Sequence, residues 1–579
     1  MSQTTTGEFT TPTTTTPTLA AAATAANWKA IVTQKQEECK RKIPPAWLLP
    51  ESITSALKLP LDTNPNKLLE LDIPRRSGIL TEHELSITED FTVGELLGKL
   101  AAGQLSSVEV TVAFSKRAAI AQQLTRCLTE TFFEEAQKRA AELDERRARG
   151  EPLGPLHGLP ISLKDTFHIK GQETNIGYVA LVGSVQTSNS ALVDILLELG
   201  AVLYVKTNIP QTLMTADSDN HVYGRVLNPH NTAINAGGSS GGEGALISFR
   251  GSLLGVGTDA AGSVRIPALC CGIYGFKPST ARIPYGGQAR SELPRLGQIL
   301  AVDGPLAKDF DSLEFFFKTV LDAEPTRFDS TALHAPFRSN AQLLASKDGK
   351  LTVGILAEDP VYPLQPPVKR IINEAVIKLL AAGHRIVQLD AAECQIDGAN
   401  EIAMEMFRLD ASVLPNMIAQ GGEPPVPSVA ALYGSPQPDR FRHIAGIEKL
   451  QGLHRQAFLN LKRHQVKEAW RKIWINNKLD VVLGPGAQNT AVRHDTYGWA
   501  PYTCLLNVLE YPAVVIPFSS ASKSKEPEHF TMPERTTGPD YVPDLVDGAP
   551  GSVQLFAPAM RDEECLLAAR IVDECLRER

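Results

Sequence analysis

Two serines in glycine-rich surroundings and one lysine at the end of an apolar segment have the residue types of an acyl-transfer site. Ser239 lies in GGSSGG, Ser263 lies in TDAAGSVR, and Lys164 ends the segment ISLK. A serine hydroxyl becomes a nucleophile when a base removes its proton. The serine loops alternate with LLGVG and IPALCCGIYGF, which are too apolar for a flexible linker. We therefore expect residues 235–277 to form a catalytic centre that Lys164 completes.

Lys164 can act as a base near neutral pH only if it releases its proton easily. Lowering a lysine pKa from about 10.4 to about 7–8 corresponds to roughly 4 kcal/mol, which burial and hydrogen bonds to neutral hydroxyls can supply. Serines suit this role because they donate and accept hydrogen bonds without adding charge. Taken without the serines, Lys164 would be interpreted as an ordinary solvated surface charge.

The small residues before Ser263 favour a second catalytic element. Ala260, Ala261 and Gly262 leave room for backbone N–H groups to approach a substrate carbonyl, as an oxyanion hole requires. The alternative is a tight turn in which Ser263 caps a helix that starts near Val264. Considered alone the cap is favoured, but together with Lys164 and Ser239 the catalytic interpretation is favoured.

Other motifs compete with this hypothesis. Residues 237–241 match G-x-S-x-G, the nucleophile elbow of α/β-hydrolases, and Asp480 and His494 could complete such a triad. The elbow needs a strand before the serine, whereas NPHNTAINA has the composition of a polar loop, so we favour the elbow interpretation less.

Residues 255–260 match a dinucleotide fingerprint, but the next acidic residue is Glu292, which is too far along the chain to bind the ribose of a dinucleotide. Neither a Walker loop nor an HExxH pair is present, and no cofactor or metal is predicted.

Composition narrows the function classes. The chain has 579 residues, is 43% hydrophobic and 21% charged, and carries a formal net charge of −8, so nucleic acid is not an expected partner. No apolar run reaches the length of a membrane span. The eight cysteines form no CxxC pair, and no secretory leader is recognisable, which favours reduced thiols and a cytoplasmic location. Cys270 and Cys271 have apolar neighbours and are interpreted as core residues.

Alternating strand and helix patterns indicate the elements that position these residues. Capping boxes begin helices at Thr92 and Ser106, and the remaining pattern predicts an α/β fold with a large parallel or mixed sheet covered by helices on both faces. We expect a disordered Thr/Ala-rich tail over 1–26 and one domain over 27–579, helical over 27–150. The main expected elements are a helix over 27–43, a charged helix over 130–149, strands over 161–164, 201–207, 253–258, 480–486 and 511–518, a helix over 241–249 and a final helix over 562–577.

Three co-ordered segments, GPLHGLPISLKD, GGSSGGEGAL and GTDAAGSVRIPA, together resemble the amidase signature family. The resemblance continues through KTNIPQ, NPHN, GFKPSTARIP, TAVRHD and SVQLFAP, from about Trp28 to the end of the chain. In detail the chain is most similar to fungal acetamidase-type general amidases, with fatty acid amide hydrolases as more distant relatives. The resemblance implies the amidase-signature fold, with the motif-bearing core over 151–330 and a C-terminal part over 331–579 that shapes the substrate pocket.

The resemblance also implies a Ser–Ser–Lys triad. Ser263 would be the acylating nucleophile, Ser239 the bridging serine after a cis peptide bond to Gly238, and neutral Lys164 the base. Backbone N–H groups of residues 260–263 would hold the oxyanion. The implied reaction is cofactor-independent hydrolysis of a linear carboxamide to a carboxylic acid and ammonia or amine, through an acyl-enzyme.

Further positions match the family with smaller roles. Ser240 and Arg265 match positions that hydrogen-bond around the triad, and Leu213 matches a substrate-contacting position of the amide hydrolases. Asp259 either fixes the serine loop by local pairing or acts as an ordinary cap. His494, in TAVRHD, is interpreted as structural.

One position departs from the family pattern, which has Gly-Gly before the nucleophile where this chain has Ala261 and Gly262. If position 261 requires a positive φ, alanine there carries about 1–2 kcal/mol of strain and distorts the oxyanion hole. The alternatives to an amidase are an esterase with the same residues, a non-catalytic family member and a glutamine amidotransferase subunit. The expected partner is a small-molecule amide, and homodimer formation stays open.

Overall fold

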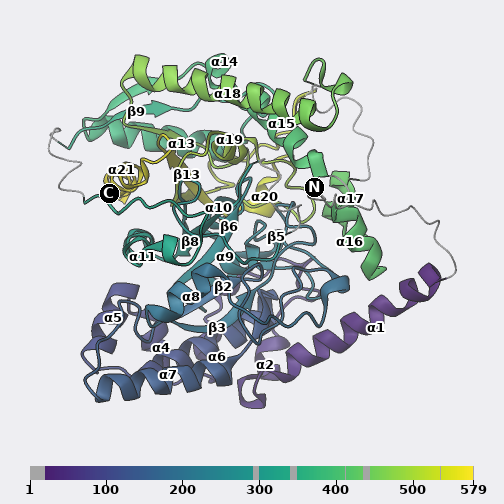
Figure 1. Ribbon diagram of the computed structural model, residues 1–579, viewed down its shortest axis with the longest axis vertical. Helices are drawn as coiled ribbons and strands as arrows, with labels where there is room; N and C mark the ends of the chain where they lie inside the picture. Colours follow the sequence, from purple (N-terminus) through teal and green to yellow (C-terminus); the bar gives the residue numbers. More distant parts are fainter. Residues whose placement is uncertain are drawn as a thin grey trace, which may run out of the picture.

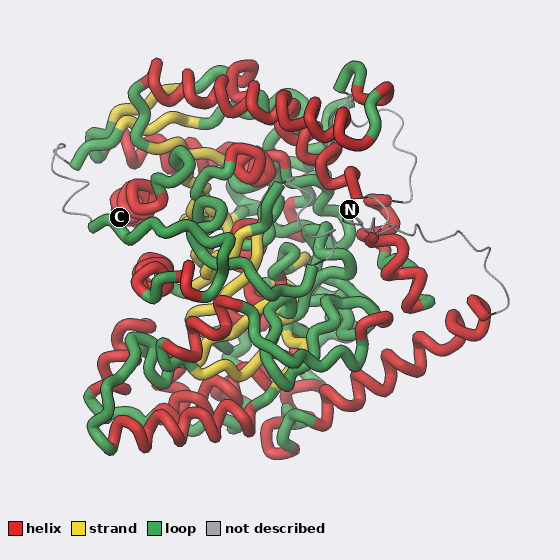
Figure 2. The backbone as a smooth tube through the Cα atoms, viewed as in Figure 1, coloured by secondary structure: helices red, strands yellow, loops and turns green. Residues whose placement is uncertain are grey.

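The computed structural model describes residues 20–290, 299–339, 349–410, 413–433, 444–534, 536 and 538–577. Within them an 11-stranded sheet forms the centre of the molecule (Figures 1 and 2). In spatial order its strands are β1 (Leu128–Thr131), β3 (Val202–Thr207), β2 (Pro160–Lys164), β6 (Leu254–Asp259), β8 (Val302–Ala307), β7 (Tyr274–Lys277), β12 (Ala513–Ser520), β13 (Pro550–Phe556), β11 (Val481–Gly484), β9 (Thr352–Ile355) and β10 (Arg385–Gln388). Strands β4 (Leu227–Asn228) and β5 (Asn231–Asn235) form a separate pair.

The sheet is mixed, as expected. Strand β2 runs parallel to both β3 and β6, and β9 runs parallel to β10 and β11. The other neighbouring strands pair antiparallel. One sheet therefore takes strands from both the 151–330 segment and the 331–579 segment.

Helices cover both faces of this sheet, which follows from the alternation of side chains along β7. The Phe276 ring packs edge-on against Phe317 of helix α11 (Phe310–Asp322), with ring centroids 5.2 Å apart. A side chain at the neighbouring Gly275 would instead meet Ala268 of helix α10 (Arg265–Cys271) on the opposite face. The predicted two-sided cover is thus confirmed.

The helices of the described residues surround the sheet, with the early helices α4 to α7 at one end and α13, α14 and α18 at the other (Figure 1). Their bounds are α1 Ala20–Arg41, α2 Glu51–Thr54, α3 Ile73–Arg76, α4 Glu82–Glu89, α5 Val93–Ala101, α6 Ser107–Thr125, α7 Phe133–Ala148, α8 Ala191–Glu198, α9 Gly241–Ser248, α10 Arg265–Cys271, α11 Phe310–Asp322, α13 Pro366–Ala381, α14 Ala391–Cys394, α15 Ile396–Phe407, α16 Val413–Gly421, α17 Pro427–Tyr433, α18 Gly452–Asn477, α19 Pro501–Leu509, α20 Pro543–Val546 and α21 Asp562–Arg577.

Local sequence signals set several of these boundaries. Both predicted capping boxes are present, with Thr92 and Ser106 as N-caps. The first helix begins earlier than expected, at Ala20, while residues 1–19 of the expected tail lie outside the described residues. The charged helix begins later than predicted, at Phe133, because residues 128–131 pair with β3 instead. The start of α7 is therefore set by strand pairing with β3, which cannot be inferred from the helical periodicity of the sequence.

Aromatic packing joins the C-terminal segments to the sheet. Trp470 of α18 contacts Phe556 of β13 and Tyr511, with centroids 5.5 and 6.4 Å apart. Helix α15 packs against both α18 and α19, and residues of α15 and α19 share a cavity with the loop that follows β6. None of the helices in the described ranges combines the length and apolar character that crossing a membrane requires.

Candidate active site

Lys164 is the last residue of β2 and lies at the edge of the sheet where β6 also ends. Parallel strands present their carboxyl ends at the same edge, and the register pairs Leu163 with Val256. The Lys164 side chain is completely buried. Its Nζ donates hydrogen bonds to Ser239 Oγ and to Thr258 Oγ1, each 2.7 Å long. The structure therefore brings Lys164 and Ser239 together as predicted.

Burial lowers the pKa of Lys164 to about 7, because an ammonium group loses its hydration in the protein interior. The carboxyl groups of Asp259, Asp303 and Glu243 act in the opposite direction and raise this pKa, but less strongly. The groups that contact Nζ directly are uncharged: the two hydroxyls and, at 3.5 Å, the backbone carbonyl of Thr258. The environment of Lys164 therefore favours the neutral amine far more than water does.

Ser239 lies just before helix α9, and the peptide bond between Gly238 and Ser239 is cis, as the family resemblance implied. Two glycines of β6 allow α9 to approach this closely. A Cβ at Gly255 would lie 2.0 Å from Glu243 Oε2, and a Cβ at Gly257 would lie 2.5 Å from Ser240 Oγ. The two glycines that resemble a dinucleotide fingerprint, Gly255 and Gly257, therefore make room for the first turn of α9.

Asp259 organises the loop that carries Ser263. Its carboxylate accepts hydrogen bonds from the backbone N–H groups of Gly262 (2.9 Å) and Val264 (3.1 Å), and from two nitrogens of Arg265 (3.0 Å each). Asp259 and Arg265 are completely buried, and the guanidinium of Arg265 holds the pKa of Asp259 well below its ordinary value. These hydrogen bonds and the positive guanidinium stabilise the charged form of the carboxylate inside the protein. The local-pairing role proposed for Asp259 is the one observed.

Two amide side chains from distant segments extend this network. Asn507 Nδ2 donates to Asp259 Oδ1 (2.9 Å), and Arg265 donates to Asn507 Oδ1 (2.7 Å) and to Gln554 Oε1 (2.9 Å). Helix α10 begins at Arg265 with Val264 as its N-cap, and no side chain caps it. The alternative in which Ser263 is a helix cap is therefore wrong.

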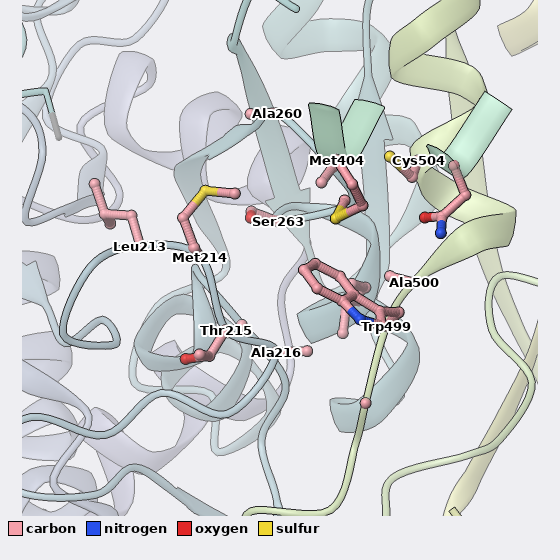
Figure 3. A pocket seen from close by; sticks show the side chains of 15 residues that line it. Leu213, Met214, Thr215, Ala216, Ala260, Ser263, Met404, Trp499, Ala500 and Cys504 are labelled. Atoms are coloured by element: carbon pink, nitrogen blue, oxygen red, sulfur yellow. The ribbon is translucent and has the colours of Figure 1, made fainter. Parts of the chain in front are cut away.

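Ser263 is half-buried in the wall of a cavity of about 50 Å³. Figure 3 shows Ser263 with Met214 on one side and Met404 and Trp499 on the other. The cavity is lined by Leu213, Met214, Thr215, Ala216, Gly238, Ala260, Ala261, Ser263, Ile266, Asn400, Met404, Gly498, Trp499, Ala500 and Cys504. A substrate in this cavity would therefore contact a serine hydroxyl within largely apolar walls.

The two serine loops are joined through their backbones, because Ser240 N donates to Ser263 O (3.2 Å). Ser240 Oγ also donates to Thr258 O, at 3.5 Å. Within the described residues no hydrogen bond links the hydroxyls of Ser239 and Ser263. The structure thus assembles the lysine with the first serine and places the second serine in the adjoining cavity.

A model of the Amidase family matches residues 109–566, most of the chain. The chain belongs to the amidase signature family. It is 39% identical to an amidase of Gibberella moniliformis, with 95% of this chain and 99% of that protein aligned. It is 36% identical to an acetamidase of Emericella nidulans, at 95% and 98% coverage. The structure superimposes on a fatty acid amide hydrolase with a TM-score of 0.84, 31% identity and 96% coverage of each chain. The amidase is accordingly a hydrolase that acts on amides.

The expected strain at Ala261 is not present in this amidase. Ala261 is not among the non-glycine residues with a positive φ, whereas Gly262 has φ +129°. A side chain at Gly262 would also lie 2.3 Å from Thr503 Oγ1. The backbone requirement for glycine therefore falls on position 262, where this chain retains it.

The nucleophile-elbow alternative does not fit the amidase structure. A strand, β5, does precede Ser239, contrary to the expected polar loop, but it pairs with β4 outside the main sheet. His494 contacts Thr232 O through Nε2 (3.0 Å) and lies 3.6 Å from Asp217, so it does not serve Ser239. His494 thus has the structural role expected of it.

Several residues of the amidase site were not predicted from the sequence. Thr258 lies within a quoted motif, and its place beside Lys164 follows only from strand register. Gln554 lies in SVQLFAP, which matched the family without indicating a role. Met404 and Trp499 belong to no motif, and the fold alone brings them to Ser263.

Proposed function

We propose that the amidase hydrolyses carboxamides with Ser263 as nucleophile, Ser239 as proton relay and Lys164 as base. The observation that carries the proposal is the 2.7 Å contact between Ser239 Oγ and a buried lysine whose pKa is about 7. A neutral amine at that distance has a lone pair that can accept the Ser239 proton. Buried lysines with lowered pKa values are a recurrent form of general base.

The proposed acylation moves two protons along the triad. The Ser263 proton moves to Ser239 while the Ser239 proton moves to Lys164, and Ser263 Oγ forms a bond to the amide carbon. The C–N bond then breaks as the relay returns a proton to the leaving nitrogen. Water adds to the resulting acyl-ester and releases the carboxylic acid and the Ser263 hydroxyl. The net reaction consumes one amide and one water and yields one acid and one amine or ammonia.

The oxyanion would be held by backbone N–H groups of the loop before Ser263. The Gly262 N–H already donates to Asp259. The N–H groups of Ala260, Ala261 and Ser263 have no acceptor among the described hydrogen bonds. We assign the oxyanion hole to these three donors, oriented by the buried Asp259–Arg265 pair.

The space directly beside Ser263 suits a short acyl group. An apolar cavity of about 150 Å³ binds benzene, and the Ser263 cavity has about a third of that volume. A second cavity of about 230 Å³ shares Met214, Thr215, Ala216, Gly498 and Trp499 with it, so the limit applies to the group held directly beside Ser263. The acetamidase names of similar fungal proteins agree with a small acyl group. We therefore propose short linear carboxamides as substrates.

We also infer a cytoplasmic location, which is supported by eight cysteines that form no disulfide.

A fluorophosphonate probe tests the assignment of the nucleophile. We expect the probe to modify Ser263 in the wild-type enzyme, and Ser263→Ala to lose both labelling and amide turnover. Ser239→Ala is expected to lose most turnover because the relay is interrupted. A probe adduct on Ser239, or labelling that persists in Ser263→Ala, would refute the assignment. Absence of labelling together with absence of turnover over a panel of amides and esters would favour a non-catalytic protein.

A further inference from the structure

Asn400 is a polar residue in the largely apolar wall of the Ser263 cavity. It lies on α15 one turn before Met404, which lines the same cavity. The Asn400 side chain is completely buried. Helix α15 packs against α19, whose Cys504 also lines the cavity, so the fold fixes the position of Asn400 relative to Ser263.

Half of the Asn400 amide has a partner inside the protein. Its Nδ2 donates to Tyr362 Oη at 2.9 Å. Tyr362 is itself held in place, because Tyr502 Oη donates to the Tyr362 backbone carbonyl at 2.7 Å. This contact orients the amide and directs its carbonyl oxygen, Oδ1, away from Tyr362.

The other half of the amide has no partner. Asn400 Oδ1 is shielded from solvent and accepts no hydrogen bond within the described residues. A buried acceptor without a donor costs about 1–3 kcal/mol, so native structures rarely leave one unless a ligand or water completes it.

None of the hydrogen bonds of the described cavity-lining residues reaches Asn400 Oδ1. Thr215 Oγ1 donates to the backbone carbonyl of Asp217 instead. Leu213, Met214, Ile266 and Met404 are apolar, and none of the described lining residues carries a charge. A neutral donor on a ligand is therefore the matching partner, because a cation there would have no compensating carboxylate.

We infer that Asn400 is a specificity-determining residue whose Oδ1 accepts a hydrogen bond from a hydroxyl on the acyl chain of the substrate. This inference rests on the proposed function and refines it to short aliphatic hydroxyacyl amides. The Ser263 cavity itself holds only a few heavy atoms, and Asn400 sets the position at which a donor is accepted there. An alkyl amide of the same length leaves Oδ1 unpaired and gains nothing from the position.

Matched pairs of primary amides test this inference. For chains of three, four and five carbons, kcat/KM is measured for the ω-hydroxyalkanamide and for the unsubstituted alkanamide. At the chain length whose hydroxyl reaches Asn400, we expect the hydroxy amide to be preferred roughly tenfold. The ω-methoxy analogue, which accepts but cannot donate, should show no preference.

Asn400→Leu removes the acceptor and approximately conserves volume, and it should abolish or reverse the hydroxyl preference. Met404→Leu, on the same helix and in the same cavity, is the control and should change kcat/KM for both members of each pair alike. Thermal melting and fluorophosphonate labelling establish that each variant is folded and has an accessible nucleophile.

The outcomes separate this inference from the proposed function. If the wild-type enzyme turns over no amide, the proposed function fails. If it turns over both members of every pair equally, or if Asn400→Leu keeps the wild-type preference, Asn400 does not determine specificity while the amidase assignment stands.

Discussion

The ionisation of Lys164 should control how the activity depends on pH. A base with a pKa of about 7 is protonated, and therefore inactive, below that pH. We expect kcat/KM to rise with pH and to level off above about pH 7, and at pH 5 only about 1% of the enzyme would carry a neutral lysine. The difference between the ordinary lysine pKa and about 7 corresponds to roughly 5 kcal/mol in favour of the neutral amine.

Thr258→Val is the perturbation that tests the origin of this ionisation. The Thr258 hydroxyl accepts one of the two 2.7 Å hydrogen bonds of Lys164 Nζ. A hydrogen bond from a charged donor contributes about 1.5–3 kcal/mol and one from a neutral donor about 1 kcal/mol, so its loss disfavours the ammonium form. The acid limb of the profile should therefore move down by about one pH unit.

Glu243→Gln is the matched control, because Glu243 also has a pKa raised to about 7 by burial. Its oxygens accept hydrogen bonds from Ser162 (2.6 Å) and Thr207 (2.9 Å) and do not contact Lys164. If Lys164 determines the profile, the acid limb persists in Glu243→Gln.

The assay is the initial rate of ammonia release from a short primary amide between pH 5 and 9, measured at low substrate concentration for all three proteins. If the acid limb disappears in Glu243→Gln, the titrating group is Glu243 and our assignment to Lys164 is wrong. A limb that stays in place in Thr258→Val would show that the Lys164 contacts do not set the pKa.

Four further substitutions test the surrounding structure. Gly262→Ala should lose at least about 2 kcal/mol of stability and most fluorophosphonate labelling, because the backbone has φ +129° and Thr503 is in the way. Ala261→Gly should keep kcat within about twofold and lower stability by less than about 1 kcal/mol, measured by urea unfolding. Arg265→Gln leaves a buried carboxylate unpaired and should cost about 3–5 kcal/mol in the same assay. Lys164→Met should abolish turnover yet raise the free energy of unfolding by about 1–4 kcal/mol. This gain in stability should be largest below pH 7, because the folded wild-type enzyme must then bury an ammonium group. It should shrink as the pH rises toward 10.5.

The sequence predicted the motif-bearing part of the site because local patterns and parallel strands define it. An apolar strand that ends at Lys164 and another that ends near Asp259 must, if parallel and adjacent, present these residues at one edge of the sheet. Lys164 can therefore be placed beside the serine loops from the sequence alone. The sequence does not identify Thr258 as the second partner of Nζ, because this depends on register and side-chain direction.

The cavity walls and the conformation before Ser263 could not be predicted in the same way. Asn400, Met404 and Trp499 reach Ser263 only through packing of α15 and the segment before α19, for which the sequence carries no motif. A Gly-Gly pattern likewise does not show which of its two positions needs a positive φ. The prediction of strain at Ala261 was wrong because the residue that needs a positive φ is Gly262.

Arg265 and Lys164 are buried cationic side chains in opposite kinds of environment, and the proposed mechanism depends on the difference. Arg265 keeps its charge beside Asp259, and the pair fixes the backbone before Ser263. Lys164 contacts hydroxyls and loses its proton readily, although Asp259 tends to hold that proton in place. In the proposed mechanism, Arg265 is therefore a positioning residue for the Ser263 loop. Because it pairs with Asp259, it would also limit the attraction of that carboxylate for the Lys164 proton.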